Sequence, residues 1–444
     1  MKKKFISLVL FIFLLSISLA FASSEDSVDL GVKENVEIDK IWTISFNQEI
    51  KSNDQFKISI RKDGIDIPIE TDISGKEVVI TPTNNYDYNA EYSIFVKLTN
   101  GKEYEKVFRT IENTKKVLLE KSDIEYAKSS KKVKIEDYIG NHKNIIIPDK
   151  IDGVPITHIG IHAFSSKGLE SVEFGDYIYS IDDWSFYDNK LTSIEIPDSV
   201  VELGKESFYK NNIKSVEIPD SVTWIGEWAF RNNDLESVRL SNYVTWIGPF
   251  AFFDNNLTSI EIPDSVLGIG HRAFSGYLND NNLETLKLGN SLISIGNNAF
   301  DGNSITSIEI PNSVETIGKG AFSHNNIETL KIPSSVTAIG GSAFWSNELT
   351  LVELPDSITS IYYATFKENN LETVEIPDSI TEIEEEAFID NNLKSVKFGN
   401  SVITIGKNAF KNNSFESINL PDSVTQIGKE AFFPLSKKYI TLGS

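Results

Sequence analysis

The sequence predicts a mostly β protein, a right-handed solenoid of about 13 turns preceded by a small β-sandwich. Two observations carry this prediction. A phenylalanine recurs every 22 residues from Phe164 to Phe432, with one longer step of 26 residues between Phe274 and Phe300. A fixed period of this size is typical of stacked repeats that bury their apolar sides against one another. Residues 36–112 instead alternate polar and apolar positions in short runs between turn residues, as antiparallel strands do.

The composition limits the classes of function. The 444 residues are 40% hydrophobic and carry a net charge of −22, with 42 Lys+Arg against 64 Asp+Glu. This balance argues against nucleic acid or an anionic membrane surface as a partner, since both require a basic face. The chain has no cysteine, which excludes disulfides, thiolate metal sites and a lipidated cysteine.

The first 22 residues are expected to be a cleaved export signal. Lys2, Lys3 and Lys4 form a basic start, residues 5–19 form an apolar segment, and residues 20–22 (Ala-Phe-Ala) match a cleavage site. The apolar run is short for a membrane anchor and ends in small residues. Cleavage would remove three lysines and bring the net charge from −22 to −25. We therefore expect a secreted or cell-surface protein with no transmembrane segment in the mature chain.

Residues 23–113 are expected to form the β-sandwich. Their first part, 23–35, is polar and predicts a flexible leader. Inward-facing residues should be Trp42, Ile44, Phe46, Ile58 and Ile94. The predicted strands are 36–38, 41–46, 56–60, 65–69, 78–82, 92–98 and 106–111.

The pattern from W-T-I-S-F-N-Q-E-I through V-V-I-T-P to Y-S-I-F-V resembles the bacterial Ig-like domains of exported proteins. This resemblance implies a spacer or interaction module and no chemistry. Residues 114–143 are expected to be a linker and the N-terminal cap of the solenoid, because an uncovered first turn would expose apolar surface. Two extended pieces, 124–126 and 133–135, flank a polar turn there and predict a hairpin.

Residues 191–212 show what each turn of the solenoid contains. The L-x-x-I-x-I segment predicts a short strand whose alternate residues face inward, and Pro197 ends its ladder because proline has no N–H. The V-x-x-I segment predicts a second short strand, and the glycine after it indicates a tight or closely packed corner. Since Asp182, Tyr362 and Glu384 occupy the same place in other repeats, a positive φ is not obligatory there.

An asparagine follows most of the periodic phenylalanines after three residues. A buried column of asparagine amides would satisfy the backbone groups that a sharp turn leaves without partners. These asparagines are Asn189, Asn211, Asn233, Asn255, Asn303, Asn325, Asn347, Asn369, Asn391 and Asn413, with Asn281 in the longer repeat.

The unit L-x-S-I-E-I-P-D-S-V-T-x-I-G-x-x-A-F-x-x-N-N resembles the BspA-like class of leucine-rich repeats, found mainly in bacterial surface proteins. The match spans residues 142–433, within a repeat domain that we place at 144–444. The resemblance implies a leucine-rich-repeat solenoid and a role in extracellular adhesion or ligand binding. It identifies no ligand.

Aromatic residues gather in a few consecutive turns at positions that are polar in other repeats. Exposed aromatic clusters often mark recognition of sugars or proteins. The alternatives are ring stacking between turns and contact with the Ig-like domain. The candidate ligand-binding residues are Trp184, Tyr187, Tyr209, Trp224, Trp228, Trp246, Phe250 and Phe253.

A column of charges is expected along the L-x-x-I-x-I strands, and its sign alternates from Glu217 to Glu353. It would be either a ligand groove or, as we favour, charge balance between stacked strands, because like charges in register repel. The column consists of Glu173, Glu195, Glu217, Arg239, Glu261, Lys287, Glu309, Lys331, Glu353, Glu375 and Lys397.

These features predict an exported, non-enzymatic binding or adhesion protein whose repeat surface recognises an extracellular protein or glycan. The alternative is a structural cell-envelope protein that acts as a spacer or self-assembly module. An enzyme is disfavoured because no nucleophile, Walker or metalloprotease motif is present in a fitting context. We expect no cofactor, no metal and no catalytic residue.

Overall fold

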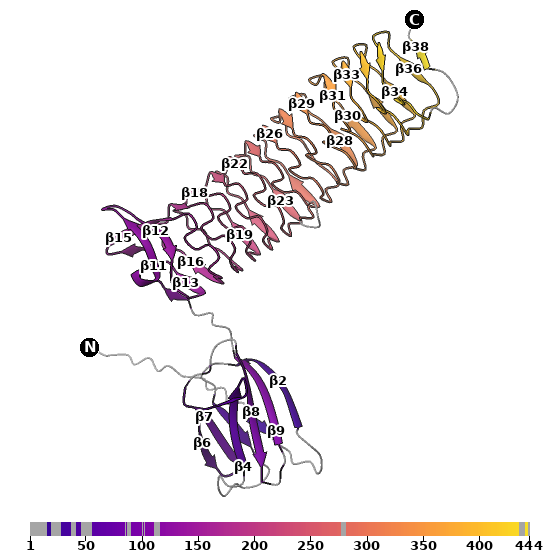
Figure 1. The fold of residues 1–444 in the computed structure, drawn as a ribbon. Coiled ribbons are helices and arrows are strands. Elements are labelled where there is room, and N and C mark those ends of the chain that lie inside the picture. Colours follow the sequence, from indigo (N-terminus) through magenta and orange to yellow (C-terminus); the bar gives the residue numbers. More distant parts are fainter. Residues whose placement is uncertain are drawn as a thin grey trace, which may run out of the picture. The chain divides into compact units, whose positions relative to one another are not determined.

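The computed structural model describes residues 16–18, 28–36, 41–45, 56–84, 86, 90–99, 101, 103–110, 116–276, 281–434 and 440–442. The chain divides into two compact units, Met1–Lys115 and Lys116–Ser444 (Figure 1). Both units consist of β-strands, and the one helical element among the described residues is the 3₁₀ turn η2 (Lys121–Asp123). The structure is thus nearly all β, as the sequence predicts.

The first unit is a β-sandwich of two sheets. One sheet has the strand order β1-β3-β7-β6, and the other has the order β2-β9-β8-β4-β5. The strands are β1 (Ser16–Ser18), β2 (Val28–Val36), β3 (Trp42–Ser45), β4 (Phe56–Lys62), β5 (Ile65–Ile67), β6 (Ile69–Ser74), β7 (Glu77–Pro82), β8 (Glu91–Leu98) and β9 (Glu103–Thr110).

The core of the sandwich joins the two sheets through aromatic rings. Trp42 on β3 meets Phe108 on β9 with ring centroids 4.8 Å apart. Trp42, Ile44 and Ile94 are each 1% exposed, which confirms that they face inward. Ile58 is half-buried and packs against this core, whereas Phe46 lies outside the described residues.

The prediction of a flexible leader over residues 23–35 is wrong for residues 28–35. These residues belong to β2, which pairs in parallel with β9 at the edge of its sheet. An edge strand tolerates polar residues because its stability comes largely from backbone hydrogen bonds on one side. Residues 23–27 lie outside the described residues, and so does the expected export signal apart from Ser16–Ser18, which form β1 beside β3.

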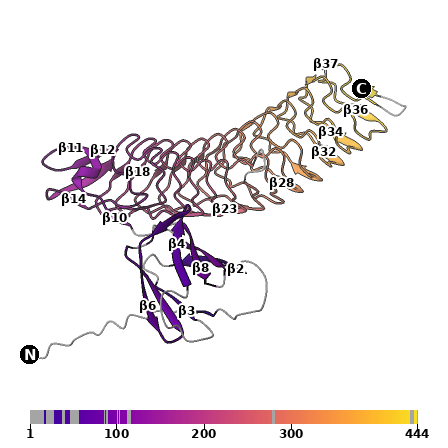
Figure 2. The same cartoon turned by 60° about the horizontal axis from the view of Figure 1, so that its bottom comes forward.

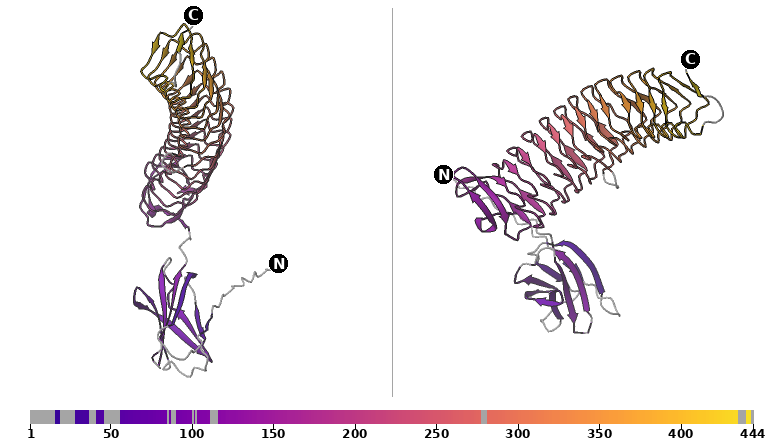
Figure 3. Two further views of the ribbon diagram at one scale, coloured as in Figure 1. Left: turned by 90° about the vertical axis from the view of Figure 1, so that its right-hand side faces the viewer. Right: turned by 45° about the horizontal axis from the view of Figure 1, so that its top comes forward.

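The second unit is a curved solenoid whose strands lie on two faces (Figures 2 and 3). Face A is formed by the L-x-x-I-x-I segments. Its strands are β10 (Val117–Leu118), β13 (Asn144–Ile146), β16 (Ser171–Glu173), β19 (Ser215–Glu217), β21 (Ser237–Arg239), β23 (Ser259–Glu261), β25 (Thr285–Lys287), β28 (Thr329–Lys331), β30 (Leu351–Glu353), β32 (Thr373–Glu375), β34 (Ser395–Lys397), β36 (Ile418–Leu420) and β38 (Ile440–Leu442).

Face B is formed by the V-x-x-I segments and by the strands at the N-terminal end of the unit. It makes one long ladder up to β29 and a second ladder from β31 to β37. Its strands are β11 (Ile124–Lys128), β12 (Val133–Tyr138), β14 (Lys150–Ile151), β15 (Val154–Ile159), β17 (Ser180–Ile181), β18 (Glu202–Leu203), β20 (Trp224–Ile225), β22 (Trp246–Ile247), β24 (Gly268–Ile269), β26 (Ser294–Ile295), β27 (Thr316–Ile317), β29 (Ala338–Ile339), β31 (Ser360–Ile361), β33 (Glu382–Ile383), β35 (Thr404–Ile405) and β37 (Gln426–Ile427).

The predicted hairpin before the first repeat is confirmed. Strands β11 and β12 pair antiparallel, and β12 pairs in parallel with β15 of the first turn. The ring of Tyr138 at the end of β12 stacks on Phe164, with centroids 5.4 Å apart. The hairpin therefore continues both the strand ladder and the aromatic column of the solenoid.

The periodic phenylalanines form one continuous stack through the interior. Successive rings from Phe164 to Phe432 lie 5.0–5.9 Å apart between centroids, and their planes differ by 2–16°. The four extra residues between Phe274 and Phe300 do not interrupt this stack, since these two rings lie 5.6 Å apart. The longer repeat therefore places its additional residues outside the column, and residues 277–280 of it lie outside the described part of the chain.

The predicted asparagine column is also confirmed, and it links neighbouring turns. Asn325 Nδ2 donates to the carbonyl oxygens of Phe300 (2.9 Å) and Phe322 (3.2 Å). Its Oδ1 accepts from the backbone N–H of Ile305 at 3.1 Å. One buried amide thus satisfies backbone groups of its own turn and of the preceding one, as the same position does from Asn189 to Asn413.

The glycine after the second strand is required by close approach of two turns. A Cβ added to Gly226 would lie 2.5 Å from the carbonyl oxygen of Gly204, although Gly226 has no positive φ. Asp182, Tyr362 and Glu384 also have no positive φ, so the corner is closely packed and does not require the left-handed region.

Candidate ligand-binding surface

The eight aromatic candidates fall into two groups on different parts of the solenoid. Trp224 and Trp246 lie on face B, on the neighbouring strands β20 and β22. The other six lie around the turn that ends in Ala-Phe, which we call the A-F turn. The sequence placed all eight in one aromatic region, and the structure separates them.

The two tryptophans of face B form a solvent-facing pair. Their ring centroids are 5.7 Å apart with an angle of 31° between the planes. Trp224 is 54% exposed, whereas Trp246 is half-buried. Register along this face places Glu202 on one side of Trp224 and Gly268 on the far side of Trp246. More than half of the Trp224 side chain stays in solvent although it contacts Trp246, so this contact accounts for only part of the ring.

Gly268 is what allows the ring of Trp246 to lie against the sheet. A Cβ on Gly268 would stand 2.3 Å from Cζ3 and 2.7 Å from Cε3 of Trp246. Gly268 is itself buried, because the indole covers it. In the sequence, Gly268 shows only that the position held by Trp224 and Trp246 in earlier repeats does not require a large side chain. Nothing there shows that the tryptophan one turn earlier packs over Gly268.

A shallow groove of about 670 Å³ begins at Trp224 and runs across the preceding turns. Charged side chains of both signs line it. Lys205 Nζ lies 3.5 Å from Glu227 Oε1, and Lys134 Nζ lies 2.6 Å from Asp182 Oδ2. The lining consists of Ile161, Ser180, Ile181, Asp182, Asp183, Val201, Glu202, Leu203, Gly204, Lys205, Thr223, Trp224, Gly226 and Glu227.

The aromatic residues of the A-F turns pack around a cation that sequence reasoning missed. The guanidinium carbon of Arg231 lies 4.5 Å from the ring centroid of Trp228 and 5.2 Å from that of Phe253. The rings of Tyr209 and Phe250 lie 5.4 and 5.8 Å from the same carbon. Phe253 is only 6% exposed, so its ring belongs to the packing. Arg231 occupies the position that Tyr209 and Phe253 hold in the neighbouring repeats. This shared position is the sequence signal that could have placed Arg231 among the aromatic rings.

Tyr187 and Trp184 extend this group toward the N-terminal end. Tyr187 meets Tyr209 with centroids 5.3 Å apart, and Trp184 stacks on His162 at 5.1 Å with an angle of 12°. Both are half-buried. Lys205 Nζ lies 5.9 Å from the ring of Trp184, so one lysine touches both the groove of face B and this aromatic group.

Trp184, Trp228 and Phe250 have positive φ values of 53°, 60° and 54°. Such values cost a bulky residue about 1–2 kcal/mol. The residue at this position also has a positive φ in each of the remaining A-F turns. The strain therefore belongs to the A-F turn itself and does not mark a binding site. The equivalent residues are His162, Glu206, Arg272, Asn298, Gly320, Ser342, Ala364, Glu386, Asn408 and Glu430.

The charge column of face A balances charge between paired strands, as expected. On this face β10, β13 and β16 form one three-stranded ladder and the later strands pair two by two, and four of these pairs each carry one ion pair between neighbouring turns. The distance between Lys331 Nζ and Glu353 Oε2, for example, is 3.1 Å. The four ion pairs are Glu217–Arg239, Glu261–Lys287, Lys331–Glu353 and Glu375–Lys397.

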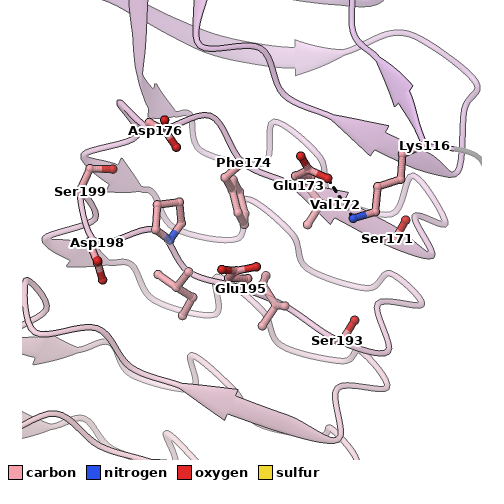
Figure 4. A pocket seen from close by; sticks show the side chains of 13 residues that line it. Lys116, Ser171, Val172, Glu173, Phe174, Asp176, Ser193, Glu195, Asp198 and Ser199 are labelled. Atoms are coloured by element: carbon pink, nitrogen blue, oxygen red, sulfur yellow. Dashed lines mark hydrogen bonds and ion pairs between the residues drawn. The ribbon is translucent and has the colours of Figure 1, made fainter. Parts of the chain in front are cut away.

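A second depression, of about 770 Å³, lies on face A beyond β16, where the next turn forms no strand (Figure 4). Carboxylates dominate its lining, and Lys116 Nζ lies 3.1 Å from Oε2 of Glu173. Within the part of the chain that the structure describes, no three acidic or histidine side chains are arranged to hold a metal ion. The acidic lining residues are Glu173, Asp176, Glu195 and Asp198.

One histidine gives the solenoid a pH-dependent stability. Its Nδ1 lies 3.0 Å from Oδ1 of the buried Asp301, and this hydrogen bond raises the pKa of His324 above its ordinary value of 6.5. Glu368 adds attraction for the proton, and the ring of Trp345 packs on the imidazole at 4.7 Å. Because the folded pKa is the higher one, this stabilisation is complete below pH 6.5 and is lost as the pH rises through the folded pKa.

We therefore expect the urea midpoint of the wild-type chain to fall as the pH is raised above 6.5, and His324→Gln to lose this fall. Burial lowers the pKa of His158, so His158 affects stability below pH 6.5. The effects of the two histidines therefore occur in different pH ranges. Equal slopes above pH 6.5 in both proteins would contradict the assignment to His324.

Among the residues described, no helix has the length and apolar character that a membrane span requires.

Strands from L-x-x-I-x-I segments, stacked turn upon turn around a phenylalanine column, define a leucine-rich-repeat protein. The family model described as BspA type leucine rich repeat region matches residues 157–281, 276–394 and 359–444. The model of the bacterial Ig-like domain matches residues 31–110. The chain therefore belongs to the BspA-type leucine-rich-repeat family and carries an N-terminal bacterial Ig-like domain.

Solved structures of bacterial leucine-rich-repeat proteins are similar to this chain. A leucine rich cell surface protein from Faecalibacterium prausnitzii is 24% identical, with 71% of this chain and 91% of that chain covered and a TM-score of 0.41. A leucine-rich repeat protein from Bacteroides ovatus is 21% identical, with coverages of 71% and 91% and a TM-score of 0.47. The pneumococcal vaccine antigen PcpA is 18% identical, with coverages of 70% and 93% and a TM-score of 0.46. No curated protein matches the chain.

Proposed function

We propose that this chain is an exported, non-enzymatic adhesion protein that recognises an extracellular protein or glycan through its leucine-rich-repeat surface. Membership of the BspA-type family supports a binding role. The observation that carries the proposal is the Trp224–Trp246 pair, of which Trp224 is 54% exposed and lines the end of a groove with charged side chains of both signs. Solvent-facing aromatic rings beside polar groups are typical of recognition surfaces.

The proposal includes the processing and division of the chain. Residues 1–22 would be removed on export, 23–113 would form the Ig-like domain, 114–143 the linker and cap, and 144–444 the repeat domain. Sequence motifs for a nucleophile or a catalytic acid–base pair are missing in any fitting context, which favours binding over catalysis.

Within the proposed surface, the two groups of aromatic candidates have different roles. Trp224 and Trp246 contact the ligand directly. Trp184, Tyr187 and Tyr209 are half-buried and flank the groove side of the A-F turns. Trp228, Phe250 and Phe253 hold Arg231 and keep the turns rigid.

We expect the full chain to bind saturably to at least one component of a panel of matrix proteins and wall polysaccharides. Replacing both Trp224 and Trp246 with serine should weaken this binding at least tenfold, because both rings leave the surface. Tyr362→Ser is the matched control, since Tyr362 is also exposed (43%) but stands in a later repeat. Surface plasmon resonance and circular dichroism would measure binding and folding.

Two outcomes would overturn the proposal. Unchanged binding by the folded double variant would remove the tryptophan pair from the site. Concentration-dependent self-association with no bound component would instead favour the structural spacer, the alternative reading of this architecture.

A further inference from the structure

The groove beside Trp224 combines three chemical features in a small space. The indole of Trp224 is 54% exposed. Four carboxylates, which can accept hydrogen bonds, and one ammonium, which can donate them, line the groove with it. Of the carboxylates, Asp182 pairs with Lys134, while Glu227 lies 3.5 Å from Lys205. The groove therefore carries charges of both signs, and its four carboxylates, those of Asp182, Asp183, Glu202 and Glu227, outnumber its one ammonium, that of Lys205.

Glu202 is the acceptor that stands directly beside Trp224 in the strand register of face B. It stands in register with Trp224 on the adjacent strand, and such neighbours lie about 4.8 Å apart. The Oγ of Ser180 donates to Glu202 Oε2 at a long 3.4 Å, and Glu202 is exposed. Its carboxylate therefore keeps acceptor capacity for a ligand hydroxyl positioned over the indole.

These features match a neutral sugar better than a protein segment. A pyranose ring has an apolar C–H face that stacks on an indole and a rim of hydroxyls that both donate and accept hydrogen bonds. Lys205 and Glu202 supply one donor group and one acceptor group beside Trp224. An anionic glycan would meet carboxylates that outnumber the ammonium of Lys205, whereas a neutral sugar has no charge for them to repel.

We infer that the face-B groove at Trp224 and Trp246 is a carbohydrate-binding site for neutral oligosaccharides, with Trp224 as the stacking platform. This inference rests on the proposed adhesion function and specifies the ligand class. Gly268 acts as a positioning residue, because any side chain there would lift the ring of Trp246 from the sheet. The groove is shallow and open, so it accepts an internal stretch of a longer oligosaccharide as readily as the end of one.

The test is an array of neutral and sialylated oligosaccharides probed with the full chain, followed by titration calorimetry on the bound compounds. We expect binding to neutral oligosaccharides only. Trp224→Ser should weaken it at least tenfold, while Trp224→Phe should retain most of it because a flat ring remains. Gly268→Ser should weaken it severalfold, and Tyr362→Ser should leave it unchanged. The affinity should change less than about twofold between 50 and 500 mM NaCl, since a neutral ligand has no charge to screen.

The same proteins, tested on matrix glycoproteins before and after enzymatic deglycosylation, separate this inference from the proposed function. Loss of binding on deglycosylation and in Trp224→Ser supports both. Binding that survives deglycosylation, with no neutral oligosaccharide bound on the array, overturns the carbohydrate site and leaves the adhesion function. Salt-sensitive binding of a decalysine peptide in competition at the groove also overturns the carbohydrate site. If the chain binds no array compound and no matrix protein, both the carbohydrate site and the adhesion function are overturned.

Discussion

Replacing Phe322 with alanine will lower the free energy of unfolding of the repeat unit by about 3–5 kcal/mol. The ring is completely buried and stacks between Phe300 at 5.4 Å and Phe344 at 5.7 Å. Its removal leaves a cavity that both neighbouring rings line, and the backbone cannot close it because each turn is held at the strand spacing by hydrogen bonds on face B. The loss is at the upper end of what a single substitution causes.

Urea unfolding followed by circular dichroism measures this loss, and Tyr243→Ala provides the control. Tyr243 is an aromatic residue of the same unit but is 58% exposed, so its truncation should change stability by no more than about 0.5 kcal/mol. A loss below about 1 kcal/mol for Phe322→Ala would show that the column contributes little. Hydrogen exchange of the flanking turns locates the damage, because stability in a repeat array is a sum of local and nearest-neighbour contributions.

Replacing Asn325 with alanine will cost about 1–3 kcal/mol, the second-largest effect that we expect. The change leaves the N–H of Ile305 without its side-chain acceptor. The carbonyl groups of Phe300 and Phe322 each lose one of two asparagine donors and keep the other, from Asn303 and Asn347 respectively. Each buried polar group without a hydrogen bond costs about 1–3 kcal/mol, and Ser323 O, the third acceptor of this amide, lies 3.1 Å from Nδ2.

The neighbouring Asn326 provides a control of the same residue type. Its side chain is exposed, so Asn326→Ala should remain within about 0.5 kcal/mol of the wild type. The same urea transitions measure both variants. Equal effects of the two substitutions would mean that the amide column does not hold the turns together.

The fold was predictable because the same physical constraints recur in every turn. A phenylalanine every 22 residues can form one buried column only if the turns stack in register. An asparagine three residues later is then also buried, and its amide must find hydrogen-bond partners in the backbone. The N-terminal cap followed from the cost of exposed apolar surface. These predictions needed no knowledge of which side chains meet across turns, since each residue meets its own equivalent.

The parts that were not predictable depend on contacts between unlike residues. Nothing in the segment 28–36 identifies it as the edge strand β2, because its pairing with β9 joins segments that are far apart in the sequence. Arg231 interrupts a column of tyrosine and phenylalanine, and only the structure shows four rings around it. Trp224 and Trp228 likewise belong to the same repeat, but Trp224 lies on face B and Trp228 lies in the A-F turn.

The pairing of strands on face A has a mechanical consequence. Face B is held by a ladder of nine consecutive strands from β15 to β29 and by a second ladder from β31 to β37. On face A, β10, β13 and β16 form one ladder and the later strands pair two by two, with a joint between one pair and the next. A pulling or bending force applied to the unit would open face A at these joints before it separated the turns along face B. Face A also forms no strand at residues 193–195 and 307–309. Under load we therefore expect the solenoid to bend mainly by opening face A, except between β29 and β31, where the ladder of face B is also interrupted.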